Sequence, residues 1–177
     1  MKPISQMNIG ELAAYICSHL ENHGIKVTLS GGACVSIYSN NKYQSFDLDF
    51  IERFSVKKNP LAEVLSKIGF FQKGRYFINP ETEFFIEFPP GPLSVGDEPV
   101  KLTETLTFET GNLHLLSPTD CVKDRLAGYY HWNDMQCLEQ AVLVSYNKQI
   151  NYKEIERWSR KEGKLDEFGF APSRVHS

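Results

Sequence analysis

Phe46-Asp47-Leu48-Asp49-Phe50-Ile51 is the stretch that decides the fold of this 177-residue chain. Its apolar residues alternate with two aspartates, which predicts a β-strand over 46–52. Because successive side chains of a strand point to opposite faces, Asp47 and Asp49 share one face, about 7 Å apart. Two like charges among apolar neighbours repel each other unless a cation lies between them. The stretch therefore predicts a divalent cation held by both carboxylates.

A glycine pair precedes this strand. Residues 25–30 predict a short buried strand, and Ser30-Gly31-Gly32 then turns the chain into a short helix. Because Gly31 and Gly32 lack Cβ atoms, phosphate oxygens can approach the backbone amides, and the N-terminus of the following helix attracts an anion. Ser30 adds a hydroxyl donor. We therefore expect Ser30, Gly31 and Gly32 to bind phosphate.

A third carboxylate lies in a later aromatic run. Aromatic segments after the aspartate strand predict an antiparallel extension of the sheet, with strands at 70–72, 76–79 and 83–88. The last of these embeds Glu87 in Phe84-Phe85-Ile86-Glu87-Phe88, where structure alone rarely tolerates a charge. If this strand lies beside that of Asp47 and Asp49, Glu87 binds the same metal and helps to deprotonate an acceptor hydroxyl.

The rest of the chain predicts helices around this sheet and one more hairpin. The expected elements are a helix at 8–23 capped by Asn8, a helix at 60–69 with Pro60 in its first turn, a loop from Pro89 to about Pro99, a hairpin at 103–116 turning about Gly111-Asn112, and helices from Pro118 to about Gly163. The expected fold class is α+β, with a small mixed, largely antiparallel sheet flanked by helices over 1–116. A C-terminal helical segment over 117–177 packs on it.

Composition limits the class of protein. With 41% hydrophobic and 23% charged residues and a formal net charge of −3, the chain resembles neither a disordered tail nor a polybasic nucleic-acid binder. It gives no strong signal for DNA binding, and any contact with nucleic acid is local. The sequence shows no signal peptide and no membrane span, which predicts a cytoplasmic protein without a membrane partner. Its four cysteines form no CxxC pair, which favours reduced, mostly buried thiols.

Other sites of phosphate chemistry do not fit. No lysine followed by Ser or Thr completes a Walker loop, and the third glycine of a dinucleotide fingerprint is missing. A metal-dependent nuclease of this kind needs a lysine two residues after its second acid, where this chain has Pro89. These three classes are therefore disfavoured.

The glycine pair, the Asp47 and Asp49 strand and the Glu87 strand together resemble the polymerase-β-like nucleotidyltransferase superfamily over residues 25–88. The Gly-Gly-Ala form is most similar to the abortive-infection (AbiE-type) toxin branch and to related uncharacterised bacterial proteins. The resemblance implies transfer of one or more NMP units from an NTP to an acceptor hydroxyl, with Mg²⁺ or Mn²⁺ on the three acids. RNA, a protein or a small molecule is the implied acceptor, and a cognate antitoxin is a candidate partner.

The resemblance extends to the helices after the sheet. In the toxin branch a basic and an acidic residue on these helices complete the nucleotide site, which places Lys123 and Asp134 in it. On the residues alone, the charges around Lys123 more often form a solvated, salt-bridged helix face, and a structural interpretation is favoured for Asp120, as a capping residue, and for Asp124 and Arg125. The competing function for the whole chain is a catalytically inactive nucleotide-binding or structural module of the same fold.

Two further segments favour structural roles. The aromatic run Tyr129-Tyr130-His131-Trp132 predicts packing between helices, although its rim could stack on a base. The mixed charges of 148–164 predict a solvated helix rather than a strip that binds tRNA.

Overall fold

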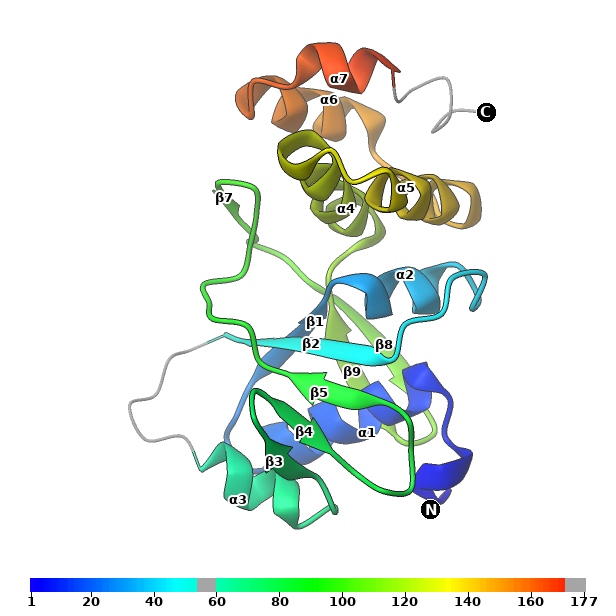
Figure 1. Ribbon diagram of the computed structural model, residues 1–177, viewed down its shortest axis with the longest axis vertical. Coiled ribbons are helices and arrows are strands. Elements are labelled where there is room, and N and C mark those ends of the chain that lie inside the picture. The colour runs from blue at the N-terminus through cyan, green and yellow to red at the C-terminus, as the bar shows by residue number, and fades with distance from the viewer. Residues whose placement is uncertain (54–59, 171–177) are drawn as a thin grey trace.

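The computed structural model describes residues 1–53 and 60–170 of the chain, and Figure 1 shows a sheet at its centre. The strands are β1 (Val27–Ser30), β2 (Asp47–Glu52), β3 (Phe71–Lys73), β4 (Tyr76–Ile78), β5 (Phe85–Glu87), β8 (Glu104–Phe108) and β9 (Gly111–Leu115). Within the described residues they form a seven-stranded sheet in the order β3-β4-β5-β2-β1-β9-β8. The β2–β5 and β1–β9 pairs are parallel and the others are antiparallel. The predicted mixed, largely antiparallel sheet is confirmed.

Helices flank the sheet and gather at one end of the molecule. Their bounds are α1 (Ile9–Asn22), α2 (Gly32–Tyr38), α3 (Leu61–Ser66), α4 (Pro118–Trp132), α5 (Met135–Asn147), α6 (Tyr152–Lys161) and α7 (Leu165–Phe170), after a short 3-10 turn at Ile4–Gln6. Helix α1 packs along β9, β1 and β8, and α2 contacts β1 and β2. Helices α4 to α7 lie together beyond α2, at the end of the molecule away from the N-terminus (Figure 1).

One continuous apolar core joins the sheet to these helices. Leu12 and Ile16 on α1, Leu48 on β2, and Leu126 and Trp158 on the C-terminal helices are all fully buried members of the same cluster. Helices α4 and α5 contact α2 at this end of the molecule. The division at residue 116 stays a prediction, and residues 171–177 of its second part lie outside the described residues.

The helix caps are where local sequence decides local structure. Asn8 and Glu11 form a capping box, in which the Asn8 side chain accepts from the Glu11 amide and the Glu11 carboxylate accepts from the Asn8 amide. Ser117 accepts from the Asp120 amide and Pro118 begins α4. Both predicted helix starts are confirmed, because these signals depend only on residues within one turn.

Several predicted boundaries are wrong. The hairpin turns before Gly111, which already pairs with Phe108. Gly111 instead allows the close approach of α1, since a side chain there would meet Ser18. The loop predicted up to Pro99 contains a small hairpin, β6 (Ser94–Val95) and β7 (Glu98–Pro99). Pro60 precedes α3 as its cap residue.

The aromatic run at the end of α4 is only partly internal. Tyr130 packs on Trp158 with ring centroids 5.7 Å apart, as predicted, whereas Trp132 is 83% exposed. The prediction of packing is therefore wrong for Trp132 and for the exposed His131, because α4 ends at Trp132 and the chain turns away through left-handed Asn133. None of the helices in the described ranges has both the length and the apolar composition of a membrane span.

Candidate functional site

The candidate site lies where β2 and β5 run side by side. Their parallel register places Asp49 opposite Glu87 and Asp47 opposite Phe85. One carboxylate oxygen each from Asp47, Asp49 and Glu87 lies within 4.8 Å of the other two. The strand adjacency on which the sequence hypothesis depended is present, and the three predicted acids form one cluster.

The cluster concentrates negative charge in a partly buried setting. Burial, followed by the charges of Asp47 and Glu87, raises the pKa of Asp49 to about 7. Burial and the charge of Glu87 also raise the pKa of Asp47. In both aspartates the surroundings disfavour the ionised form, so the site attracts positive charge.

Two oxygens of the cluster lack partners. The Oδ1 atoms of Asp47 and Asp49 are buried and have no hydrogen-bond partner among the described residues. Unpaired buried carboxylate oxygens are costly unless a proton or a cation satisfies them. Hard cations such as Mg²⁺ and Mn²⁺ prefer oxygen donors, so the three carboxylates fit such an ion.

The glycine turn lies directly against this cluster. Gly31 has φ +70°, and a Cβ atom built on it would lie 2.7 Å from Asp49 Oδ2. Glycine is therefore required here both for the left-handed backbone and for the approach of Asp49. Gly32 begins α2, and Ser30 pairs with Asp49 across the sheet while its hydroxyl donates to the Asp49 carbonyl at 3.3 Å. The turn predicted to bind phosphate and the acids thus share one site.

Two arginines approach the cluster without neutralising it. Arg75 Nε lies 3.5 Å from Glu87 Oε1, but its side chain is 73% exposed, and such pairs are weak. The charge of Arg125 on α4 offsets part of the rise in the pKa of Asp49. No ion pair joins Arg125 to Asp49 among the described contacts; its guanidinium binds Asp124 instead, at 2.6 Å.

Arg125 is the residue that the sequence reasoning missed. The predicted salt-bridged face is present, with Arg125 paired to Asp124, but the predicted solvation is wrong, because the Arg125 side chain is only 20% exposed. A signal was present in the sequence, since Arg125 lies three residues after Val122 and one before Leu126, both fully buried. It therefore borders the apolar stripe of α4.

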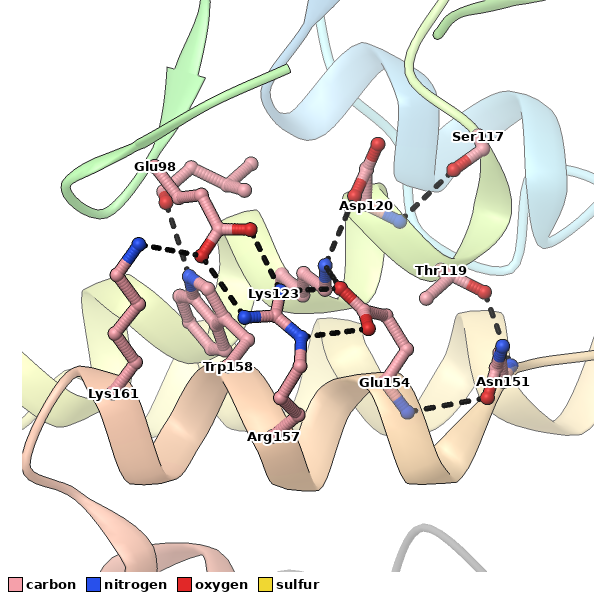
Figure 2. A network of polar contacts seen from close by, with 11 residues as sticks. Glu98, Ser117, Thr119, Asp120, Lys123, Asn151, Glu154, Arg157, Trp158 and Lys161 are labelled. Carbon is pink, nitrogen blue, oxygen red and sulfur yellow. Dashed lines mark hydrogen bonds and ion pairs between the residues drawn. The ribbon is translucent and has the colours of Figure 1, made fainter. Parts of the chain in front are cut away.

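Lys123 and Asp134 have structural partners in the C-terminal helices. Figure 2 shows Lys123 between Glu154 and Asp120, with Nζ–O distances of 2.9 and 3.5 Å. Asp134 caps α5 by accepting from the amides of Gln136 and Cys137. Neither residue is among the groups that shift the pKa of the cluster aspartates. The structure does not bring them together with the three acids.

No protein-family model and no curated protein sequence matches the chain. Among solved structures, it is similar to the antibiotic-resistance factor ANT(2'')-Ia, an aminoglycoside nucleotidyltransferase, with a TM-score of 0.53 and 10% identity. The match covers 95% of this chain and 96% of that one. The chain has a nucleotidyltransferase fold. At this identity the likeness describes the fold alone, and the abortive-infection branch stays a prediction.

Proposed function

We propose that this protein is a nucleotidyltransferase that depends on a divalent metal ion. The observation that carries the proposal is the cluster of Asp47, Asp49 and Glu87 on adjacent strands of a nucleotidyltransferase fold, with carboxylate oxygens within 4.8 Å. The unpartnered Oδ1 atoms and the raised pKa of Asp49 support a cation there. Mg²⁺ is the ion we expect, with Mn²⁺ as the substitute, and we expect the enzyme to work in the cytoplasm.

The reaction assigns a role to each acid. Asp47, Asp49 and Glu87 hold the ion, which when bound neutralises triphosphate charge and lowers the pKa of a hydroxyl. Glu87 accepts the proton of the acceptor hydroxyl. The hydroxyl oxygen forms a bond to the α-phosphorus of the NTP, the bond from that phosphorus to the bridging oxygen breaks, and pyrophosphate leaves.

The glycine turn positions the triphosphate. Ser30 and Gly31 lie beside Asp49 and Gly32 follows them in the turn, so phosphate oxygens on the turn's amides would be next to the metal ligands. That Lys123 and Asp134 bind the nucleotide stays a prediction. Their ion pairs and cap contacts would have to exchange for contacts with the nucleotide.

The charge distribution supports a small acceptor molecule over RNA. The net charge is −3, and cations of the C-terminal helices are paired with acids, as in Arg157–Glu154, Arg160–Glu156 and Lys164–Glu167. RNA binding depends on unpaired basic groups that contact phosphates. We therefore rank a hydroxyl on a small molecule first, as in the aminoglycoside-modifying neighbour, and toxin-like modification of RNA, with its antitoxin partner, second.

The test separates binding from catalysis. Calorimetric titration with each of the four NTPs in Mg²⁺ should show binding by the wild type and none by Asp49→Ala. Labelled NTP should then release pyrophosphate when incubated with pools of small hydroxyl compounds or bulk RNA. Metal-dependent binding without turnover in any pool would support the inactive nucleotide-binding module, and absence of binding would contradict the enzyme and support a purely structural module.

A further inference from the structure

The loop between α2 and β2 brings a tyrosine back to the glycine turn. A Cβ atom built on Gly32 would lie 3.3 Å from Cε1 of Tyr43, 3.5 Å from its Oη and 3.5 Å from Oγ of Ser45. A Cβ atom on the preceding Gly31 would meet Asp49 Oδ2. Since consecutive Cα atoms are about 3.8 Å apart, the Tyr43 hydroxyl and the Asp49 carboxylate reach adjacent residues of one turn.

Hydrogen bonds fix this loop where it returns to the sheet. The amide of Ser45 donates to Oγ of Ser36, a buried residue of α2, at 2.9 Å. The Ser45 hydroxyl donates to the carbonyl of Asp47 at 3.1 Å. Tyr43 stands two residues before this fixed point, and its partly buried ring packs against the apolar core. A side chain held in this way loses little freedom when it meets a ligand.

The hydroxyl of Tyr43 differs from those of the tyrosines that hold the core together. Tyr38 donates to the Leu116 carbonyl at 2.6 Å, and the Tyr130 hydroxyl lies 2.8 Å from Oγ of Ser159. The Tyr43 hydroxyl has no hydrogen-bond partner among the described residues. Its O–H is therefore available as a donor, and a negatively charged phosphate oxygen is the strongest acceptor expected at this turn.

We propose that Tyr43 donates its hydroxyl hydrogen to a phosphate oxygen of the NTP at the glycine turn. Gly32 is then glycine because a side chain would displace the Tyr43 ring, as Gly31 is glycine because of Asp49. A neutral donor also binds phosphate without competing with the metal ion for the carboxylates. This inference rests on the proposed function, because the site depends on the three acids and not on the short helix α2.

The experiment compares Tyr43→Phe with the wild type by calorimetry, first with Mg²⁺ alone and then with tripolyphosphate in saturating Mg²⁺. The variant keeps the ring and loses only the hydroxyl, so tripolyphosphate binding should weaken about tenfold while Mg²⁺ binding stays unchanged. Binding of all four NTPs should weaken by the same factor, because the lost contact is to phosphate. Tyr15→Phe is the matched control, since Tyr15 on α1 also packs partly buried against the core, and it should bind as the wild type does.

Three results would overturn the role of Tyr43. Wild-type affinity of Tyr43→Phe for tripolyphosphate would show that the hydroxyl does not contact phosphate. A melting temperature of ligand-free Tyr43→Phe well below that of the wild type would show that the hydroxyl has a structural partner. An NMP group found by mass spectrometry on the wild type, but not on Tyr43→Phe, after incubation with NTP would show that the hydroxyl is an acceptor. A wild type that binds neither Mg²⁺ nor tripolyphosphate contradicts the proposed function itself.

Discussion

The molecule contains two groups of charged side chains that are opposite in electrostatic character. In the cluster on β2 and β5, the acids face one another and the pKa of Asp49 is raised to about 7. In the network that joins α4, α6 and β7, drawn in Figure 2, Arg157 and Lys123 surround Glu154 and lower its pKa to about 2. The acids on β2 and β5 thus lack close ion-pair partners of matching strength, whereas Glu154 is paired with two cations.

The two groups differ in whether a bound cation would add compensation for their negative charge. Glu98 receives Arg157 at 2.6 Å and Lys161 at 3.3 Å, which anchors the β6–β7 hairpin to α6 together with the bond from Trp158 Nε1 to the Val95 carbonyl at 3.0 Å. This network stabilises the fold without further partners. Among the described residues, the acids on β2 and β5 have only the exposed Arg75 and the charge of Arg125 as compensation, and a bound cation would supply more.

The largest effect is expected from removing one charge of the cluster. Asp49→Asn preserves the shape of the side chain but removes a metal ligand, so turnover should fall by at least about 10³-fold. Pyrophosphate release measured over a Mg²⁺ titration checks this. Asp166→Asn, an exposed acid on α7, is the matched control and should retain wild-type turnover. Equal rates for Asp49→Asn and the wild type would show that the cluster on β2 and β5 does not need the charge of Asp49 for turnover.

The second largest effect on turnover is expected from a substitution at Gly31, whose backbone lies beside the acids. Gly31→Ala places a Cβ 2.7 Å from Asp49 Oδ2 at a φ of +70°, so either the turn or the carboxylate must move. We expect about 1–2 kcal/mol lower stability and about 30-fold slower turnover. Gly163→Ala shares the positive φ, with no heavy atom within 4 Å, and should lose stability but not turnover. Equal turnover losses in both variants would contradict a specific role for Gly31.

Much of this site could be predicted from the sequence, because its geometry is set within strands. The two-residue period of β2 places Asp47 and Asp49 on one face whatever the rest of the chain does. The low exposure of Arg125 is only indicated by its place beside the apolar stripe of α4, because how far it is buried also depends on how α5 packs against α4. Likewise, the partner of Lys123 is Glu154, 31 residues away on α6, and local spacing carries no information about such a contact.

A smaller effect is expected on the pH dependence of the metal-free protein. The pKa of Asp49 is higher in the folded state than its usual value near 3.8, so the folded state binds the extra proton between about pH 4 and 7. Its contribution to stability is therefore greatest at low pH and declines as pH rises to about 7. Asp49→Asn should raise the metal-free stability at pH 8 by about 2 kcal/mol, and less at pH 5.

Mg²⁺ should reverse this trend in the wild type. Because the ion competes with the proton for the same carboxylate, the rise in melting temperature caused by Mg²⁺ should be larger at pH 8 than at pH 5. Melting curves with Mg²⁺ and with EDTA at both pH values check this. If the Mg²⁺ effect were the same at both pH values, or if Asp49→Asn showed it too, the cation would not bind through Asp49.

The smallest effect is expected in the ion-pair network of Lys123, Glu154 and Arg157, where a substitution should change stability alone. Glu154→Gln leaves the buried Lys123 with Asp120 at 3.5 Å as its remaining acid, so we expect a loss of about 1–2 kcal/mol at pH 7. The pKa of Glu154 is lowered on folding, so its contribution is present above about pH 4.5 and is lost as pH falls towards 2. The difference from the wild type should therefore shrink below pH 4 in urea unfolding curves, while affinity for Mg²⁺ stays unchanged. If this variant instead lost Mg²⁺ or triphosphate binding, the two charged regions would be energetically coupled, and the predicted place of Lys123 in the nucleotide site would gain direct support.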